Sequence, residues 1–177
     1  LTSVDAAARA VQGVKAVLRV PLGHNGGEGV AVVADGYWPA QLGREALKLQ
    51  WETSGVEKVD SARQLAQYRE LAAKPGARHF DADMAPLETA PNKIEAEFVF
   101  PYLAHAPMEP LNCTVRIGTD GAELWIGTQF PGVDGQAAAR VLGMKPEQIK
   151  VHVQMAGGGF GRRAVPSSDY VVEACEV

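Results

Sequence analysis

The chain has 177 residues, of which 46% are hydrophobic and 21% charged, which is typical of one ordinary globular domain or two small ones. Its formal net charge of −4 argues against a nucleic-acid-binding surface. No run of about 18 apolar residues is present, so no membrane span is predicted. The cysteines, Cys113 and Cys175, form no metal-binding pattern with each other or with the histidines, although a disulfide between them stays open. Neither composition nor the N-terminal stretch distinguishes a bacterial cytoplasm from a periplasm.

The N-terminal part predicts a small α+β unit, because β-branched runs bounded by glycine and proline alternate with helical patterns. The expected elements are a helix at 6–12, strands at 13–20 and 29–36 joined by a loop at 21–29, and a helix at 37–51 that runs into a strand ending near Trp51 and Glu52. We assign this unit to residues 1–55.

The middle part predicts one helix and a linker, at residues 56–92. A helix is expected at 61–76, where Ser61 and Gln64 form a capping-box pattern. Residues 74–92 contain three prolines and little periodicity, which is typical of a linker or a long surface connection.

The C-terminal part, residues 93–177, has a cleaner pattern of alternating apolar and polar residues, which predicts half-buried strands. Asp134 is a candidate cap of a helix here, and Gly143 is its expected C-terminal stop. The expected elements are strands at 93–100, 111–118 and 123–130, a hairpin turn at 119–121, a helix at 133–144, a strand at 149–155 and a further helix toward the C-terminus. The predicted fold class is therefore mixed α+β.

A glycine-rich loop follows the last strand, in the stretch "QMAGGGFGRR" at 154–163. Glycine at this density costs chain entropy, so we interpret it as backbone approached so closely that side chains would collide. A phosphate-binding P-loop is poorly supported, because Arg162, Arg163 and Ala164 follow Gly161 where Lys and Ser or Thr are required. A dinucleotide-binding pattern matches formally at Gly159, Gly161 and Ala164, although Pro166 stands where its helix would run. The plainer alternative is a tight turn without a ligand.

Three motifs in order suggest a family: "AHAPMEPLNC" at 104–113, "TQFP" at 128–131 and "MAGGGFGRR" at 155–163. Together they resemble the molybdenum-cofactor subunit of the xanthine dehydrogenase/aldehyde oxidase family, most nearly the beta subunit of isoquinoline 1-oxidoreductase-type enzymes. The resemblance implies that 1–55 is the end of an α/β hammerhead domain and that 93–177 opens a molybdopterin-binding domain. Both ends look cut, since the helical pattern at 167–177 stops without a cap, so the chain is expected to be a fragment.

The resemblance also implies roles for particular residues. Gln129, the candidate catalytic residue, would hydrogen-bond an oxo or hydroxo ligand of molybdenum, and Phe160 would lie beside the oxo ligands. Arg162 and Arg163 would offset the charge of the pterin phosphate or dithiolene, or be plain surface cations. The expected cofactor-binding residues are Gly157, Gly158, Gly159, Phe160, Gly161 and Arg162.

We expect the segment "HAPMEP" to support this site rather than to bind zinc. His105 and Glu109 are four residues apart, but Pro107 and Pro110 forbid the helix that would bring them together as a metal-binding pair.

The implied parent protein is a molybdenum hydroxylase that oxidises an N-heterocycle or aldehyde with water-derived oxygen and passes electrons to an iron–sulfur subunit. Its cofactor is expected to be molybdopterin, in a dinucleotide form. Ala164 stands where purine-oxidising relatives have a glutamate, which favours a less polar substrate, and the family's catalytic glutamate lies downstream of this chain. The fragment itself is expected to be inactive, to bind no cofactor and to self-associate through bare apolar surface. The alternative is a non-catalytic assembly module or a nucleotide-binding protein.

Overall fold

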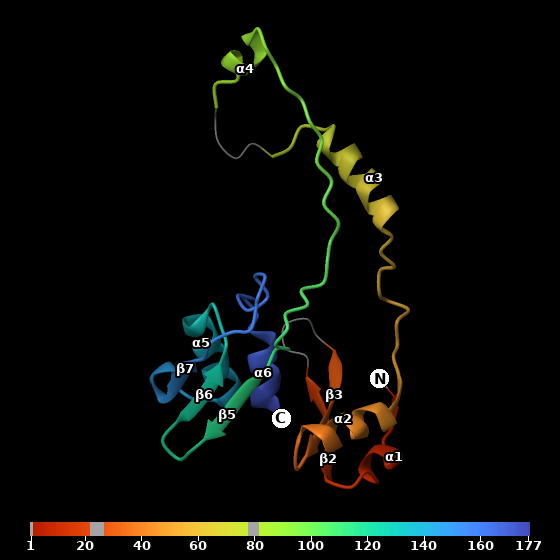
Figure 1. Cartoon of the computed structure of the whole chain (residues 1–177), viewed down its shortest axis with the longest axis vertical. Coiled ribbons are helices and arrows are strands. Elements are labelled where there is room, and N and C mark those ends of the chain that lie inside the picture. The colour runs from red at the N-terminus through yellow and green to blue at the C-terminus, as the bar shows by residue number, and fades with distance from the viewer. Residues whose placement is uncertain (1, 22–26, 78–81) are drawn as a thin grey trace. The chain divides into compact units, whose positions relative to one another are not determined.

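The computed structural model describes residues 2–21, 27–77 and 82–177, and it has the predicted mixed α+β class (Figure 1). The chain divides into two units, one made of Leu1–Glu52 with His105–Val177 and the other of Thr53–Ala104. Most of the expected loop at 21–29 and part of the linker at 74–92 lie outside the described residues. The assignment of hammerhead and molybdopterin-binding domains stays a prediction.

The N-terminal part of the first unit confirms the expected helices and strands and adds one short strand. The elements are β1 (Thr2–Val4), α1 (Ala6–Arg9), β2 (Val14–Pro21), β3 (Glu28–Ala34), α2 (Tyr37–Ala46) and β4 (Lys48–Gln50). Two antiparallel pairs form, β2 with β3 and β1 with β4. Helix α2 packs closely on the β2–β3 pair: a Cβ at Gly43 would lie 2.8 Å from Val32 Cγ1 and 2.9 Å from Val14 Cγ2.

The second unit contains two helices with no buried residues, α3 (Ser61–Ala72) and α4 (Ala85–Thr89). The capping box expected at Ser61 is wrong, because Asp60 is the N-cap and its carboxylate accepts the Arg63 N–H at 2.8 Å. Helix α4 was not expected, since it is a short turn within a proline-containing segment.

The strand expected at 93–100 is also wrong. These residues belong to no sheet among the described parts of the chain. Alternation gives the segment an apolar side, but a strand also needs a neighbour for its N–H and C=O groups. Side chains attach it to α3 instead: Arg69 pairs with Glu97 at 2.5 Å, and the hydroxyls of Tyr68 and Tyr102 lie 3.1 Å apart.

A three-stranded sheet forms the C-terminal part of the first unit, in the order β5 (Cys113–Ile117), β6 (Ala122–Ile126) and β7 (Ile149–Val153). Strands β5 and β6 form an antiparallel hairpin, whereas β6 and β7 run parallel and are connected through α5 (Pro131–Leu142) and a 3₁₀ turn, η2 (Pro146–Gln148). Helix α5 contacts β7, α6 (Asp169–Glu176) contacts β5, and the two helices contact each other, so they cover one face of the sheet. The buried core between them is Leu124, Ile126, Ala138, Tyr170 and Val171.

The ends of α5 show one expectation confirmed and one corrected. Gly143 ends the helix in the left-handed conformation at φ 65°, as expected. Asp134 is not its cap, because the helix begins two residues earlier than expected, with Pro131 in its first turn. The Asp134 carboxylate is instead buried and accepts a hydrogen bond from the Thr128 hydroxyl.

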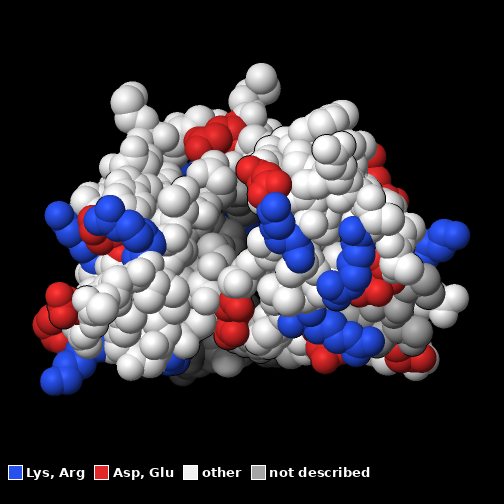
Figure 2. Space-filling view, turned by 90° about the horizontal axis from the view of Figure 1, so that it is seen from below, with Lys and Arg blue, Asp and Glu red and all other residues white. Residues whose placement is uncertain are grey.

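The surface is of mixed charge. On the face shown in Figure 2, lysines and arginines are interspersed with aspartates and glutamates, without one large patch of a single sign. Within the part of the chain that the structure describes, no helix has the length and apolarity needed to cross a membrane.

Candidate functional site at the ends of two parallel strands

The site is placed by the parallel pairing of β6 and β7, because parallel strands have their carboxyl ends at the same edge of a sheet. Gln129 follows β6, and the glycine-rich loop follows β7. One further hydrogen bond, from the Gln154 N–H to the Ile126 carbonyl at 2.8 Å, keeps the two strand ends together. A Cβ on Gly159 would lie 3.1 Å from Gln129 Oε1. The structure thus brings together two of the residues that the sequence singled out.

The glycines of the loop face different neighbours, which corrects part of the sequence interpretation. A Cβ on Gly157 would lie 2.6 Å from Glu109 Cβ, and one on Gly158 would lie 3.2 Å from Pro107 Cβ. At these two positions protein occupies the space of the missing side chains. Gly161, at φ +88°, has nothing within 4 Å of its Cβ position, so this side of the loop is open.

The backbone of the loop offers a row of free hydrogen-bond donors. Among the described residues, no acceptor is found for the N–H groups of Gly158, Gly159, Phe160 and Gly161. Gly158 and Phe160 have positive φ angles of 103° and 52°, and the Phe160 side chain is 75% exposed. Successive free N–H groups in such a backbone form concavities that bind anions. The Gln129 side chain is exposed too and hydrogen-bonds to no described residue.

Arg163 is buried, so the prediction that it could be a plain surface cation is wrong. Its side chain has 0% exposure. The guanidinium donates to the carbonyl of Gly158 at 2.6 Å, to that of Gly127 at 3.0 Å and to that of Glu109 at 3.0 Å. A further bond joins it to the Glu109 carboxylate at 3.1 Å. Arg163 is therefore committed to protein groups and does not face a ligand.

Arg162 lies at the edge of the loop and is half-buried. Both of its terminal nitrogens bond the Asp169 carboxylate, at 3.0 and 2.8 Å. This pair connects the glycine-rich loop to the first turn of α6.

Glu109 joins the "HAPMEP" segment to the loop, which is the supporting role expected for that segment. Its carboxylate accepts the Gly157 N–H at 2.5 Å and the Asn112 amide at 2.9 Å. The pKa of Glu109 is held below its usual value, mainly by the bond from the Gly157 N–H and next by the bond from Asn112, with a smaller contribution from the charge of Arg163. Partial desolvation raises the pKa but does not outweigh these contacts. The group is therefore a carboxylate at neutral pH. Sequence reasoning missed this pairing because Glu109 and Arg163 are 54 residues apart and follow no shared periodicity.

Comparison with known proteins gives the family. The family model for the molybdopterin cofactor-binding domain matches residues 72–175, which is more than half of the chain. The chain belongs to this family. Isoquinoline 1-oxidoreductase subunit beta of Brevundimonas diminuta is 32% identical over 187 aligned residues, covering 98% of this chain and 23% of that protein. The crystal structure of quinoline 2-oxidoreductase from Pseudomonas putida 86 shares the fold, with a TM-score of 0.64 at 18% identity, over 97% of this chain and 27% of that one.

The residues of this molybdopterin cofactor-binding domain fit an anionic, oxygen-rich group. Four successive N–H donors and the Gln129 carboxamide lie at one edge of the sheet, and the loop is open at Gly161. The dinucleotide-binding pattern fits less well, because it needs a helix directly after its glycines, whereas α6 begins only at Asp169.

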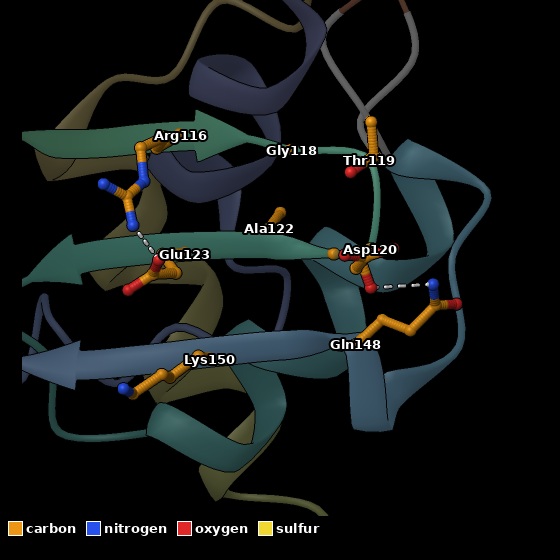
Figure 3. Close-up of a pocket in the computed structure, with 9 residues that line it drawn as sticks. Arg116, Gly118, Thr119, Asp120, Ala122, Glu123, Gln148 and Lys150 are labelled. Carbon is orange, nitrogen blue, oxygen red and sulfur yellow. Dashed lines mark hydrogen bonds and ion pairs between the residues drawn. The ribbon is translucent and has the colours of Figure 1, made fainter.

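A hollow of the domain lies at the opposite end of the same strands (Figure 3). Arg116 and Glu123 form an ion pair at its rim, and the Gln148 amide donates to the Asp120 carbonyl at 3.2 Å. The hollow is lined by the turn between β5 and β6 and by charged side chains, and it contains none of the residues predicted to bind the cofactor. No group of three or more His, Cys, Asp or Glu placed to hold a metal is present in residues 2–21, 27–77 and 82–177.

The two cysteines are free thiols in the domain, so the disulfide that the sequence left open is not formed. Both pack at the edge of the buried core between the sheet and α6. Burial, with smaller contributions from Cys175 and Asp134, raises the pKa of the Cys113 thiol to about 12. Cys113 is therefore a small apolar core residue rather than a nucleophile.

Proposed function

We propose that this chain forms one wall of the molybdopterin site of a molybdenum hydroxylase. The reaction would be oxidation of a C–H bond of an N-heterocycle or aldehyde, with oxygen derived from water. The observation that carries the proposal is the row of free N–H groups at 158–161 beside the Gln129 side chain. The names of the two matched relatives, which refer to isoquinoline and quinoline, support an N-heterocycle.

Each residue of the site has a role that its chemistry allows. The N–H groups of Gly157 to Gly161 that are not used within the protein would bind anionic oxygens of the cofactor, and being fixed in advance they would need no reorganisation. Gln129 would orient the cofactor through a carboxamide that donates and accepts hydrogen bonds and stays neutral at every working pH. Phe160 would border the site with an apolar surface, and Arg162, whose charge is balanced by Asp169, would hold this end of the loop to α6. When bound, the cofactor supplies the redox centre that receives the electrons taken from the substrate.

Two finer points belong to the same proposal. Ala164 places no carboxylate after the loop, so we expect a substrate less polar than a purine. The electrons would leave through an iron–sulfur partner subunit, and the molybdopterin would be in a dinucleotide form.

The proposal is tested by measuring the metal content of the complete enzyme to which we assign the chain. We expect stoichiometric molybdenum. A preparation that lacks molybdenum and binds a nucleotide through Gly159, Gly161 and Ala164 would contradict the proposal and favour the alternative.

Replacing Gln129 tests the site itself. We expect Gln129→Ala to lower kcat by roughly a hundredfold, the usual effect of losing one preorganised donor, with molybdenum still bound. Gln136→Ala is the matched control, because Gln136 is an exposed glutamine on α5. Equal kcat values for the two variants and the unchanged enzyme would remove Gln129 from the site.

A further inference from the structure

We propose that Arg163 and Glu109 are positioning residues that hold the glycine-rich loop against Gln129. The inference rests on the proposed function of the loop, and it goes further by assigning roles to residues that do not themselves face the bound group. Two observations carry it: the buried contacts of the Arg163 side chain, and the bonds made by its main chain.

The Arg163 side chain joins three segments that are distant in sequence. Its donors reach the loop at Gly158, the end of β6 at Gly127, and Glu109. A planar guanidinium can do this because its five N–H groups point in fixed directions, which an ammonium group cannot reproduce. With 0% exposure, water cannot replace any bond that is lost.

The Arg163 main chain fixes Gln129 at the same time. Its carbonyl accepts the Gln129 N–H at 3.0 Å. One residue therefore sets the positions of both sides of the candidate site, through its side chain on the loop and through its carbonyl on Gln129. A movement of Arg163 would change the distance between them.

Glu109 supplies the opposite charge and holds the start of the loop. It exchanges two bonds with Gly157, one from the Gly157 N–H to the carboxylate at 2.5 Å and one from its own N–H to the Gly157 carbonyl at 3.2 Å. Its carboxylate also neutralises the buried guanidinium of Arg163. Removing Glu109 leaves the buried charge of Arg163 unpaired, which is more costly than losing one hydrogen bond.

Amide hydrogen exchange in the 177-residue chain tests the positioning role without any cofactor. In Arg163→Lys we expect the amides of Glu109, Gly157 and Gln129 to exchange about tenfold faster or more, because their acceptors are no longer held in place. The amide of Leu124, in the centre of β6, should exchange as before. Arg140→Lys is the control, since Arg140 is exposed on α5.

Glu109 variants provide a second, graded measurement, which also serves if Arg163→Lys does not fold. Glu109→Gln keeps an oxygen that can accept the Gly157 N–H, so it should accelerate exchange less than Glu109→Ala. Unchanged exchange at Gly157 in both Glu109 variants would overturn the positioning role, whatever the cofactor content.

Measurements on the complete enzyme distinguish a positioning role from a purely structural one. We expect Arg163→Lys and Glu109→Ala to alter the electron paramagnetic resonance signal of molybdenum and to lower kcat more than they change KM. A loosened loop with an unchanged molybdenum signal and unchanged kcat would overturn the proposal. Absence of molybdenum from the unchanged enzyme would instead contradict the proposed function, and the exchange results on the chain would still decide whether Arg163 and Glu109 hold the loop.

Discussion

At the scale of single residues, Phe160 is the clearest case of a side chain kept in an unfavourable backbone conformation. Its φ of 52° is left-handed, which costs a residue with a Cβ roughly 1–2 kcal/mol, and its 75% exposed side chain recovers little by packing. We predict that Phe160→Gly leaves the free energy of unfolding unchanged or raises it by up to about 1 kcal/mol, because relief of strain offsets the greater chain entropy of glycine. Urea unfolding of the chain measures this.

The matched control for Phe160 is Phe130, which has an ordinary φ of −129° and is 42% exposed. Phe130→Gly should lower the stability, since it relieves no strain. If both variants lose the same stability, the Phe160 side chain packs against the protein after all.

Sequence motifs were enough to bring Gln129 and the glycine-rich loop to one site, but not to find what holds them. The motifs give the residues that we propose to face the cofactor, and their order along the chain matches strand ends that pairing places together. Arg163 could not be assigned, because burial of a charged residue depends on carbonyl groups from three segments. Local sequence pattern carries no information about such contacts between distant segments.

At the scale of elements, α3 depends on its cap more than a packed helix does, because none of its residues is buried. We predict that Asp60→Ala destabilises α3 by about 1 kcal/mol, through loss of the bond to the Arg63 N–H. The measurement is faster amide exchange within 61–72, together with loss of helical circular dichroism. Ser61→Ala is the matched control and should have little effect. A larger effect from Ser61→Ala would restore the capping box expected from sequence.

The sequence predicted best the elements in which the alternation of apolar and polar residues matches the alternation of buried and more exposed side chains. Leu124 and Ile126 alternate with half-buried residues on β6, and both lie in the core. Residues 93–100 alternate equally well and yet form no strand among the described parts of the chain. Alternation shows that a segment has an apolar side, whereas strand formation also requires a neighbouring backbone, which the pattern does not reveal.

At the scale of the whole molecule, the chain spans 23% of the isoquinoline 1-oxidoreductase subunit that it matches and 27% of the quinoline 2-oxidoreductase chain. It also carries apolar side chains that are largely exposed. In the segment around 93–103 the exposed fractions are 97% for Ile94, 76% for Phe98, 82% for Phe100 and 78% for Leu103. Apolar residues gathered in this way are typical of surfaces that associate.

We therefore predict that the isolated chain self-associates and that Phe98→Ser combined with Phe100→Ser weakens the association. Each phenylalanine that becomes buried between copies contributes roughly 1.5–3 kcal/mol, so two serines should lower the association constant by at least about tenfold. Sedimentation velocity over a range of chain concentrations measures the change. Glu95→Ser is the control, since Glu95 lies on the polar side of the same alternating segment and should leave association unchanged. A chain that sediments as a monomer at every concentration, or a double variant that associates as strongly as the unchanged chain, would show that this segment does not drive contact between copies.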